Sequence, residues 1–531
     1  VGIGFDSYRD RQTAFAFTTN VAGVKNDFIW SRDGQVEDDT WDPIWFTGAK
    51  MYEWGWAAEM RIPLTQLRFR ITDDGEWGME VFRRVFRNQE MSVWQPIDRN
   101  ASGIVHNFGR LTGLTDIKPR KQADITPFVV GSHETFESEA GNPFSTGSAW
   151  KYNGGLDAKF GITNNMTLDL TVNPDFGQVE ADPSEVNLTA YETFFEEKRP
   201  FFIEGNNITS FRTGLGDGDL GFDNLFYSRR IGRSPHLWAE TDDNEYARMP
   251  RVTPIIGAAK VTGKTPDGLS VGIVEAVTAE GKAEIDNMGE RSWQTVEPLT
   301  NYLITRVMRD FSGGKTIIGG AFTNTHRFLE GTGIDELVHN ANTAGIDFTH
   351  YFGEERNWFV SSAAAGSNLT GNTTAIEKLQ RSSVHYFQRP DADYVEVNPD
   401  RTSLNGFGGN VQAGKIGGRW NFMTFMYMKS PGLDLNDVGY LQSADAIITG
   451  LWTAYRFDKP FSIFRQIRPN ANYWTGWDFG GTHLFTGGNL SVYVQFKNLW
   501  WTNFGGNYEG ASISNSLLRG GPSMLHPSGA N

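Results

Sequence analysis

The stretch Met166-Thr-Leu-Asp-Leu-Thr-Val172 alternates without exception between apolar and polar side chains. Successive side chains of a β-strand point to opposite faces, so the four apolar residues share one face and Thr167, Asp169 and Thr171 share the other. Leu490-Ser-Val-Tyr-Val-Gln-Phe-Lys497 alternates in nearly the same way. Both stretches predict strands that separate an apolar from a polar environment.

Segments of this kind continue from about residue 122 onward, and turn signals such as Ser312-Gly-Gly314 separate them. A soluble propeller would repeat a motif in every blade, and no such repeat is present. A transmembrane β-barrel uses strands of about ten residues with interfacial aromatic girdles, and Leu499-Trp-Trp501 and Tyr473-Trp-Thr-Gly-Trp477 suit such girdles. With about 20–25 residues per strand and connection, residues 122–510 predict about 16–19 strands.

Residues 1–118 have a different texture, with many Trp residues and short β-prone runs that end at turn formers. This pattern predicts a β-sandwich. A polar, proline-containing stretch at Asp116-Ile-Lys-Pro-Arg-Lys121 then marks a boundary. The predicted organisation is therefore all-β, with a sandwich over 1–118 and an antiparallel transmembrane β-barrel over 119–531.

Composition excludes several classes of function. The 531 residues include 48 Lys and Arg against 63 Asp and Glu, a net charge of −15, which argues against a nucleic-acid partner. The chain has no cysteine, which excludes thiol nucleophiles, Fe–S clusters and disulfides. It also has no run of about 18 apolar residues, so no transmembrane helix is expected.

A segment over 173–233 does not fit the wall of a barrel. It is acidic between Asp175 and Glu204, and residues 182–197 predict a short helix with Asp182 as N-cap. An acidic helix cannot face lipid, so we expect it in the lumen or outside the bilayer. Its carboxylates either form a constriction that selects solutes or pair with arginines as a structural buttress. The residues concerned are Asp175, Glu180, Asp182, Glu196, Glu197, Arg229, Arg230 and Arg233.

Three runs in this region resemble an outer-membrane β-barrel family catalogued as domain of unknown function 5916. They are Asn173-Pro-Asp-Phe-Gly-Gln-Val-Glu-Ala-Asp-Pro183, Glu192-Thr-Phe-Phe-Glu-Glu-Lys-Arg-Pro-Phe-Phe-Ile-Glu-Gly205 and Phe226-Tyr-Ser-Arg-Arg-Ile-Gly232. Ser430-Pro-Gly-Leu-Asp-Leu-Asn-Asp-Val-Gly-Tyr440 and Arg519-Gly-Gly-Pro522 resemble later motifs of the same family. The resemblance implies export by a Gram-negative, Bacteroidetes-like bacterium and insertion in outer-membrane lipid.

The N-terminal block resembles the second half of a family 9 carbohydrate-binding module, through Phe5-Asp-Ser-Tyr-Arg-Asp-Arg-Gln-Thr-Ala14, Asp39-Thr-Trp-Asp42 and Gly55-Trp-Ala-Ala-Glu-Met-Arg-Ile-Pro63. That resemblance implies glycan binding. Indole faces stack on sugar rings, although tryptophans of a sandwich also fill its core. The candidate sugar-binding residues are Trp41, Trp45, Trp54, Trp56 and Trp94. The module's opening strands are missing before Val1, and 522–531 lacks a final aromatic strand, so we expect a portion of a longer chain.

No catalytic residue can be nominated. Modules of the resembled type often hold calcium, for which Asp6, Asp38 and Asp39 are candidates, but their spacing fits no calcium loop. No cofactor other than this possible calcium is expected. Glycoside hydrolysis needs two opposed carboxyl groups, and 63 acidic residues do not single out a pair. The sequence predicts a glycan-binding outer-membrane barrel for carbohydrate capture or uptake. The alternatives are an envelope assembly or interaction protein and a membrane-anchored glycoside hydrolase.

Overall fold

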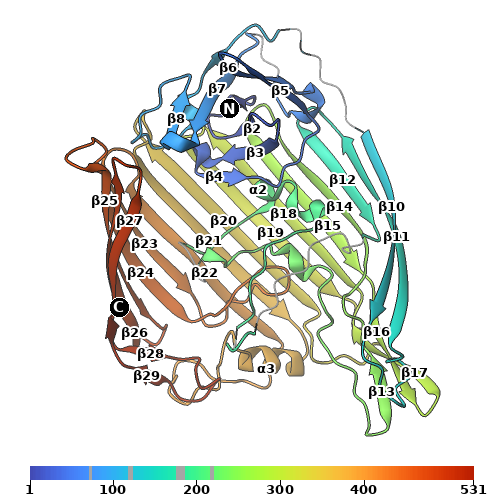
Figure 1. Ribbon diagram of the computed structural model, residues 1–531. Coiled ribbons are helices and arrows are strands. Elements are labelled where there is room, and N and C mark those ends of the chain that lie inside the picture. Colours follow the sequence, from blue (N-terminus) through green and yellow to red (C-terminus); the bar gives the residue numbers. More distant parts are fainter. Residues whose placement is uncertain are drawn as a thin grey trace.

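The computed structural model describes residues 1–70, 74–115, 117, 123–174, 186–189, 191–215 and 221–530. A large antiparallel sheet curls into a barrel wall, and a smaller β-domain of residues 1–111 covers one end of it (Figure 1). Both the N-terminal domain and the wall are built from strands, as predicted. None of the helices in the described ranges is long and apolar enough to cross a membrane.

The wall is a 16-stranded sheet in which nearly all neighbours in sequence are neighbours in space. One edge of this sheet is β10, and the other edge is formed by β27 and β30. In the described residues no hydrogen bond joins these two edges. The strands are β10 (Ala123–Thr135), β11 (Ser148–Gly161), β12 (Met166–Val172), β14 (Ile255–Lys264), β15 (Leu269–Thr278), β18 (Thr300–Phe311), β19 (Thr316–Arg327), β20 (Asn340–Phe352), β21 (Trp358–Thr370), β22 (Ser403–Lys415), β23 (Trp420–Lys429), β24 (Ala446–Tyr455), β25 (Phe464–Trp477), β26 (His483–Phe496), β27 (Trp501–Glu509) and β30 (Gly529–Ala530).

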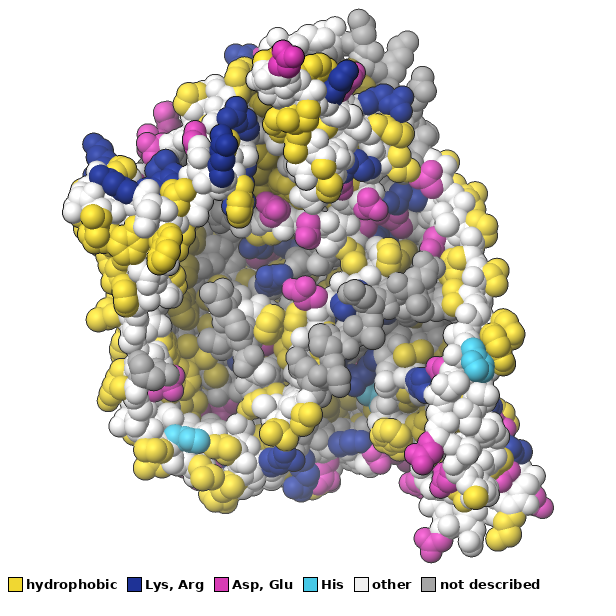
Figure 2. All heavy atoms as spheres, in the orientation of Figure 1, with side chains coloured by type: hydrophobic (Ala, Val, Ile, Leu, Met, Phe, Trp, Pro, Cys, Tyr) yellow, Lys and Arg dark blue, Asp and Glu magenta, His cyan; other side chains and the backbone are white. Residues whose placement is uncertain are grey.

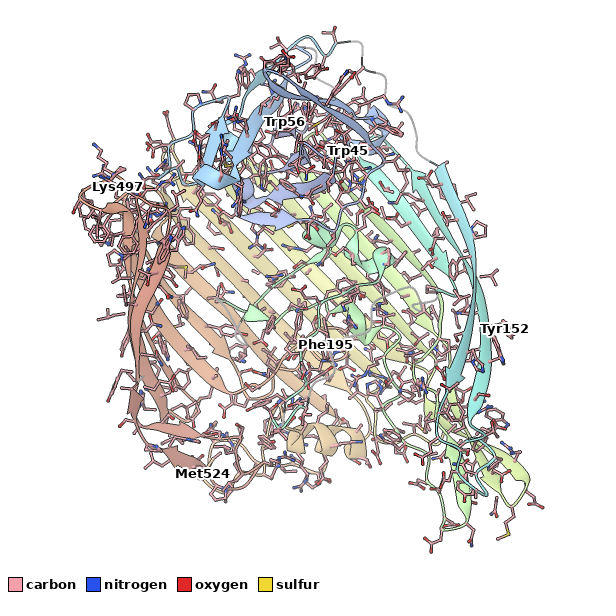
Figure 3. The ribbon with its side chains drawn as sticks, viewed as in Figure 1. Trp45, Trp56, Tyr152, Phe195, Lys497 and Met524 are labelled. Carbon is pink, nitrogen blue, oxygen red and sulfur yellow. The ribbon has the colours of Figure 1, made fainter. Side chains whose placement is uncertain are left out.

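Alternation along these strands separates two environments. In β12 the polar residues Thr167, Asp169 and Thr171 are buried toward the interior, whereas Val172 is exposed on the outside. Figure 2 shows charged side chains gathered in the hollow of the barrel and hydrophobic side chains along its outer edges. Tyr152 points away from the wall (Figure 3), as expected of a lipid-facing aromatic side chain. The prediction of a transmembrane β-barrel is confirmed.

The two ends of the barrel differ in the length of their connections. At the end that carries the N-terminal domain, the wall strands are joined by short turns over 162–165, 265–268, 312–315, 353–357, 416–419, 456–463 and 497–500. At the other end most connections are long, over 136–147, 173–254, 279–299, 328–339, 371–402, 430–445 and 478–482. The long connections carry α3 (Thr373–Arg381) and a small sheet of β13 (Glu245–Arg248), β16 (Gly281–Asn287) and β17 (Glu290–Glu297). The chain ends near a further pair, β28 (Ser512–Ser514) and β29 (Met524–His526).

The N-terminal domain has one main sheet, in the order β4-β3-β2-β1-β7-β8 with β9 paired to β7, and a separate hairpin of β5 and β6. Aromatic residues fill its core, among them Phe15, Phe17, Trp45 and Trp77. The strands are β1 (Gly2–Asp6), β2 (Ala14–Thr19), β3 (Lys25–Ser31), β4 (Val36–Asp38), β5 (Phe46–Tyr52), β6 (Gly55–Arg61), β7 (Trp77–Val85), β8 (Glu90–Val93) and β9 (Gly109–Leu111). Short 3-10 turns lie at Arg32–Gly34, Leu64–Gln66, Phe86–Asn88, Val105–Asn107 and, in the lumen, Ser228–Arg230.

The helix predicted over 182–197 is not found in the part of that range that the structure describes. Residues 191–199 are irregular, because side chains satisfy their backbone: the Tyr227 hydroxyl both accepts from Phe195 N–H (3.0 Å) and donates to the Phe195 carbonyl (2.9 Å). Pro200 also holds the preceding residue extended. The helices here are the single turns α1 (Pro200–Ile203) and α2 (Asn206–Thr209).

Candidate functional site: the lumen and the docked domain

The described segment 191–233, without 216–220, runs inside the barrel, and we refer to it as the lumenal segment. Phe195 lies near the middle of the interior in Figure 3. Its apolar residues form two cores with inward-facing wall residues. Phe202, Phe226 and Ile231 pack with Ile255, Ala258, Val274, Ala276, Tyr302 and Ile304. Phe211 and Leu225 pack with Ala363, Ala365 and the inward-folded connection at Leu433 and Leu435.

Ion pairs of two buried arginines connect different parts of the lumenal segment. The Arg199 guanidinium donates to the Glu197 carboxylate (2.6 and 2.8 Å) and to the carbonyls of Ile231 (2.7 Å) and Ser228 (2.6 Å). The Ser228 hydroxyl donates to the same carboxylate. Arg230 donates to Glu192 (2.7 and 2.8 Å). These contacts join the two halves of the segment into one unit.

The predicted acidic and basic residues therefore have different roles. Glu197 pairs with Arg199, Arg230 pairs with Glu192, and Arg229 donates to the main-chain carbonyl of Glu196 (3.0 Å from Nε). The Arg233 carbonyl accepts from Thr253 N–H (2.9 Å), and no described carboxylate forms an ion pair with its side chain. Asp175, Glu180 and Asp182 lie outside the described residues. Pairing with arginines is what the buttress hypothesis predicts, and both hypotheses for this segment stay predictions.

Two further contacts fasten the lumenal segment to the wall. Asp223, which has no exposed surface, accepts from Lys429 Nζ (3.1 Å) and from the Tyr427 hydroxyl of β23. The Phe211 ring lies 4.9 Å from the Arg306 guanidinium of β18, which is held in turn by both oxygens of Asp347 (2.7 and 2.8 Å). A cation over an aromatic face in such a buried setting is stabilising.

Glu204 joins three parts of the molecule. Its carboxylate pairs with Lys159 of β11 and lies 3.8 Å from the guanidinium of Arg68 in the N-terminal domain. Its carbonyl accepts from Lys260 Nζ of β14 (2.7 Å). The lumenal segment, the wall and the N-terminal domain therefore meet at one charged junction.

The N-terminal domain is docked on the short turns through buried polar contacts. Arg356, from the turn 353–357, is 2% exposed and donates to Asp33 Oδ2 (3.0 Å) and the Arg11 carbonyl (2.9 Å). Lys264 donates to Asp10 Oδ2 (2.6 Å). At the far side of the mouth, Gln89 accepts from Trp501 Nε1 (2.8 Å). The sequence offered no signal for these contacts, because the paired residues are hundreds of positions apart.

The five candidate tryptophans do not share one surface. Trp41 and Trp45 pack on Phe17 (5.5 and 5.3 Å between ring centres), and Trp45 is only 1% exposed. Its ring has no face free for a sugar. The prediction that Trp45 binds sugar is therefore wrong, and Trp45 is a core residue. Trp54 is 74% exposed and stacks on Tyr52 (5.1 Å, 10° between planes), at the turn of the β5–β6 hairpin. Trp56 is half-buried on β6 and Trp94 is exposed beside Gly109.

The calcium candidates are not brought together. Asp6 is buried, and its carboxylate accepts from the backbone N–H groups of Asp10 (3.1 Å) and Arg11 (3.0 Å). Asp38 caps the N–H of Thr40 (3.1 Å), and Asp39 is exposed. Across the described ranges no three Asp, Glu or His side chains are grouped as a metal site would require.

A wall that is apolar outside and polar inside, around a packed lumenal segment, defines an outer-membrane β-barrel protein, placed in the bacterial outer membrane. The chain belongs to the family described as Domain of unknown function (DUF5916), whose sequence profile matches residues 123–515.

No curated protein matches the chain. Among solved structures, OpdK of Pseudomonas aeruginosa with vanillate is similar at a TM-score of 0.29 and 8% identity, covering 85% of this chain and 90% of that one. A porin refined at 1.8 Å has a TM-score of 0.27 and 11% identity, covering 72% and 100%. A BenF-like porin from Pseudomonas fluorescens Pf-5 has a TM-score of 0.26 and 11% identity, covering 73% and 93%. At these scores the barrel assignment rests on the register and exposure of the wall itself.

Proposed function

We propose that this chain is an outer-membrane channel for solutes, with carbohydrate as its cargo. The observation that carries the proposal is that the described residues fill the lumen asymmetrically. The lumenal segment is anchored on the inner faces of β14 to β23, through residues such as Val274, Ala363 and Tyr427. The inner faces of β25 to β27 carry half-exposed polar side chains, among them Asn472, Asn489 and Asn507. Water and solutes need such a polar surface to cross the bilayer.

The N-terminal domain would act at the periplasmic mouth of this channel. Outer-membrane barrels have short periplasmic turns and longer extracellular loops. The domain contacts the short turns at 312–315, 353–357 and 416–419, through Gly314, Arg356 and Gly418. It would therefore meet a solute that leaves the barrel on the periplasmic side.

Glycan binding by this domain is the finer part of the proposal. Stacked Tyr52 and Trp54 present a flat aromatic surface on the β5–β6 hairpin, with Trp56 two residues further along the chain. Flat aromatic surfaces suit the apolar faces of sugar rings. The same hairpin also exposes Phe46 and Met51, and this apolar cluster favours a second candidate function, docking of another envelope protein.

The channel is tested with the full chain reconstituted in planar bilayers. We expect discrete ion-current steps from protein whose band on an unheated gel migrates faster than its heated band, as folded barrels do. Folded, inserted protein without current would contradict the channel.

For the β5–β6 hairpin, a glycan array with wild type, Trp54→Ala and Trp56→Ala distinguishes glycan binding from docking of another envelope protein. Glycan binding that both variants lose supports the sugar site. Absence of glycan binding, with a periplasmic protein retained after gentle detergent extraction and lost in Trp54→Ala, supports the docking function.

A further inference from the structure

The inner face of β24 to β27 differs in composition from the rest of the lumen. Register places Trp452, Asn472, Asn489 and Asn507 directly side by side across the four strands. The next inward position along β25 and β26 pairs Asn470 with Ser491. This face is therefore a regular array of amide, hydroxyl and aromatic groups rather than of charges.

The register of β23 and β24 fixes the direction in which this face points. Tyr427 lies opposite Ile448, and its hydroxyl donates to Asp223 of the lumenal segment, so that position faces the lumen. Trp452 lies four residues from Ile448 along β24 and shares its side of the strand. Leu451, Tyr473 and Leu490 occupy positions of the opposite parity, so they point outward, and all three are apolar or aromatic and exposed.

Trp474 lies against the inner side of the wall. It pairs with Gly487, and a Cβ atom added at Gly487 would lie 2.6 Å from the indole atoms Cε2 and Nε1. The indole therefore occupies the space that a side chain at position 487 would need. Phe425 lies over Gly450 of β24 in a similar way, with a Cβ there 2.5 Å from its ring. Glycine at these two positions makes room for the neighbouring aromatic rings.

Polar groups flank these rings. Asn472 Nδ2 donates to Asn489 Oδ1 (2.7 Å), which leaves one carbonyl oxygen and further N–H groups of the pair available to a ligand. Tyr493, on the same face, is 45% exposed. The charged side chains at the inward positions of β24 to β27 are Arg468, 5.8 Å from the Trp452 ring, and Glu509, which accepts from Asn507 (3.2 Å). Amides, hydroxyls and aromatic rings therefore outnumber charges on this face.

We propose that this face is a binding track for neutral oligosaccharides, and we call Trp452, Asn472, Trp474, Asn489, Tyr493 and Asn507 the lumenal track. The inference rests on the proposed channel function and deepens it by naming the residues that bind the carbohydrate cargo and by restricting that cargo to neutral oligosaccharides. Sugar rings stack their C–H faces on flat indoles, and side-chain amides donate to and accept from the hydroxyls. An anionic cargo would instead call for a row of unpaired Arg or Lys, and the inward positions of β24 to β27 carry a single basic residue, Arg468.

The test measures block of the ion current by maltohexaose, cellohexaose and laminarihexaose with the full chain in planar bilayers. Isothermal titration calorimetry of the same sugars with the detergent-solubilised protein measures their affinity independently of the ion current. The variants are Trp474→Ala, which removes the platform, and Gly487→Ala, whose added methyl displaces the indole. Tyr473→Ala is the matched control, because it removes an aromatic ring from the lipid-facing side of the same strand. Each variant is first checked for the fast-migrating folded band.

We expect at least one hexasaccharide to block the current, and both track variants to raise the half-blocking concentration by about tenfold or more. Tyr473→Ala should match wild type. A conducting channel that no hexasaccharide blocks or binds would overturn the track and leave the channel standing. Equal affinity in wild type and Trp474→Ala would also overturn it. Folded protein that binds a hexasaccharide through Trp474 but carries no current would support the track and refute the channel.

Discussion

Arg356 of the barrel and Asp33 of the N-terminal domain form a buried ion pair, with Nη1 3.0 Å from Oδ2 and both side chains only 3% exposed. Asp33 also accepts from the backbone N–H of His106 (2.9 Å) and contacts its Nδ1 (2.6 Å). An arginine from a barrel turn thus completes a polar cluster inside another domain. With the domain docked, an unpaired guanidinium at this depth would be costly, so the docked arrangement depends on the pairing with Asp33.

Asp33→Ala is expected to loosen the docking of the N-terminal domain. Removing one partner of a buried ion pair costs about 3–5 kcal/mol, because the other charge stays buried. Hydrogen–deuterium exchange of residues 1–111 in detergent should become faster. Asp267→Ala, which removes the exposed Arg309–Asp267 pair (3.2 Å), is the control and should cost about 0–1 kcal/mol. Equal exchange in both variants would contradict a docking role for Asp33.

Phe211→Ala is expected to loosen the lumenal segment. The ring is 2% exposed and lies between the Arg306 guanidinium and the apolar cluster around Leu433. Truncating a buried phenylalanine costs about 3–5 kcal/mol. In planar bilayers the variant should show a larger or noisier current, because part of the lumen is freed. Phe504→Ala, on the exposed outer face, should conduct like wild type. An unchanged current in Phe211→Ala would show that the segment does not limit conduction.

Trp45→Ala and Trp54→Ala should separate core packing from surface function. Trp45 is buried against Phe17, and its Nε1 donates to Asp27 (2.9 Å), so its loss should cost about 3–5 kcal/mol. Trp54 is exposed, and we expect its loss to change stability by about 0.5 kcal/mol or less. Thermal unfolding of the N-terminal domain, followed by near-ultraviolet circular dichroism, measures both. Similar melting temperatures for the two variants would argue against the core position of Trp45.

Stability of the N-terminal domain should depend on pH through Asp6. Burial, and then the neighbouring Asp10 carboxylate, raise the pKa of Asp6 to about 8. The unfolded chain releases this proton near its ordinary pKa of about 4, whereas the folded domain keeps it. The domain should therefore lose stability as the pH rises from about 4 to about 8. Asp6→Asn should flatten this dependence in denaturant titrations at pH 5, 6.5 and 8, whereas Asp39→Asn, at an exposed position, should not. Parallel profiles for wild type and Asp6→Asn would exclude Asp6 as the cause.

Alternation was sufficient to predict the wall, because a strand between lipid and lumen must present different side chains to each. The same reasoning could not predict that Trp45 is buried and Trp54 is exposed. The exposure of each depends on where the β5–β6 hairpin lies relative to the main sheet. Nor could it locate the Arg356–Asp33 pair, which spans 323 positions. Local capping signals favoured a helix over 182–197, whereas contacts with the distant Tyr227 hold the described residues 191–197 in an irregular conformation. Tertiary contacts of this kind leave no local pattern.

The lumenal segment also bears on how the protein is made. It precedes in the chain every strand on which its two apolar cores rest, since Phe202 and Phe211 come before β14, β18 and β21. A wall that closed without this segment inside would leave inward apolar residues of these strands, such as Ile255, Val274 and Ile304, facing water. Correct assembly therefore requires the lumenal segment to be enclosed as the wall closes, which couples the folding of the interior to that of the sheet.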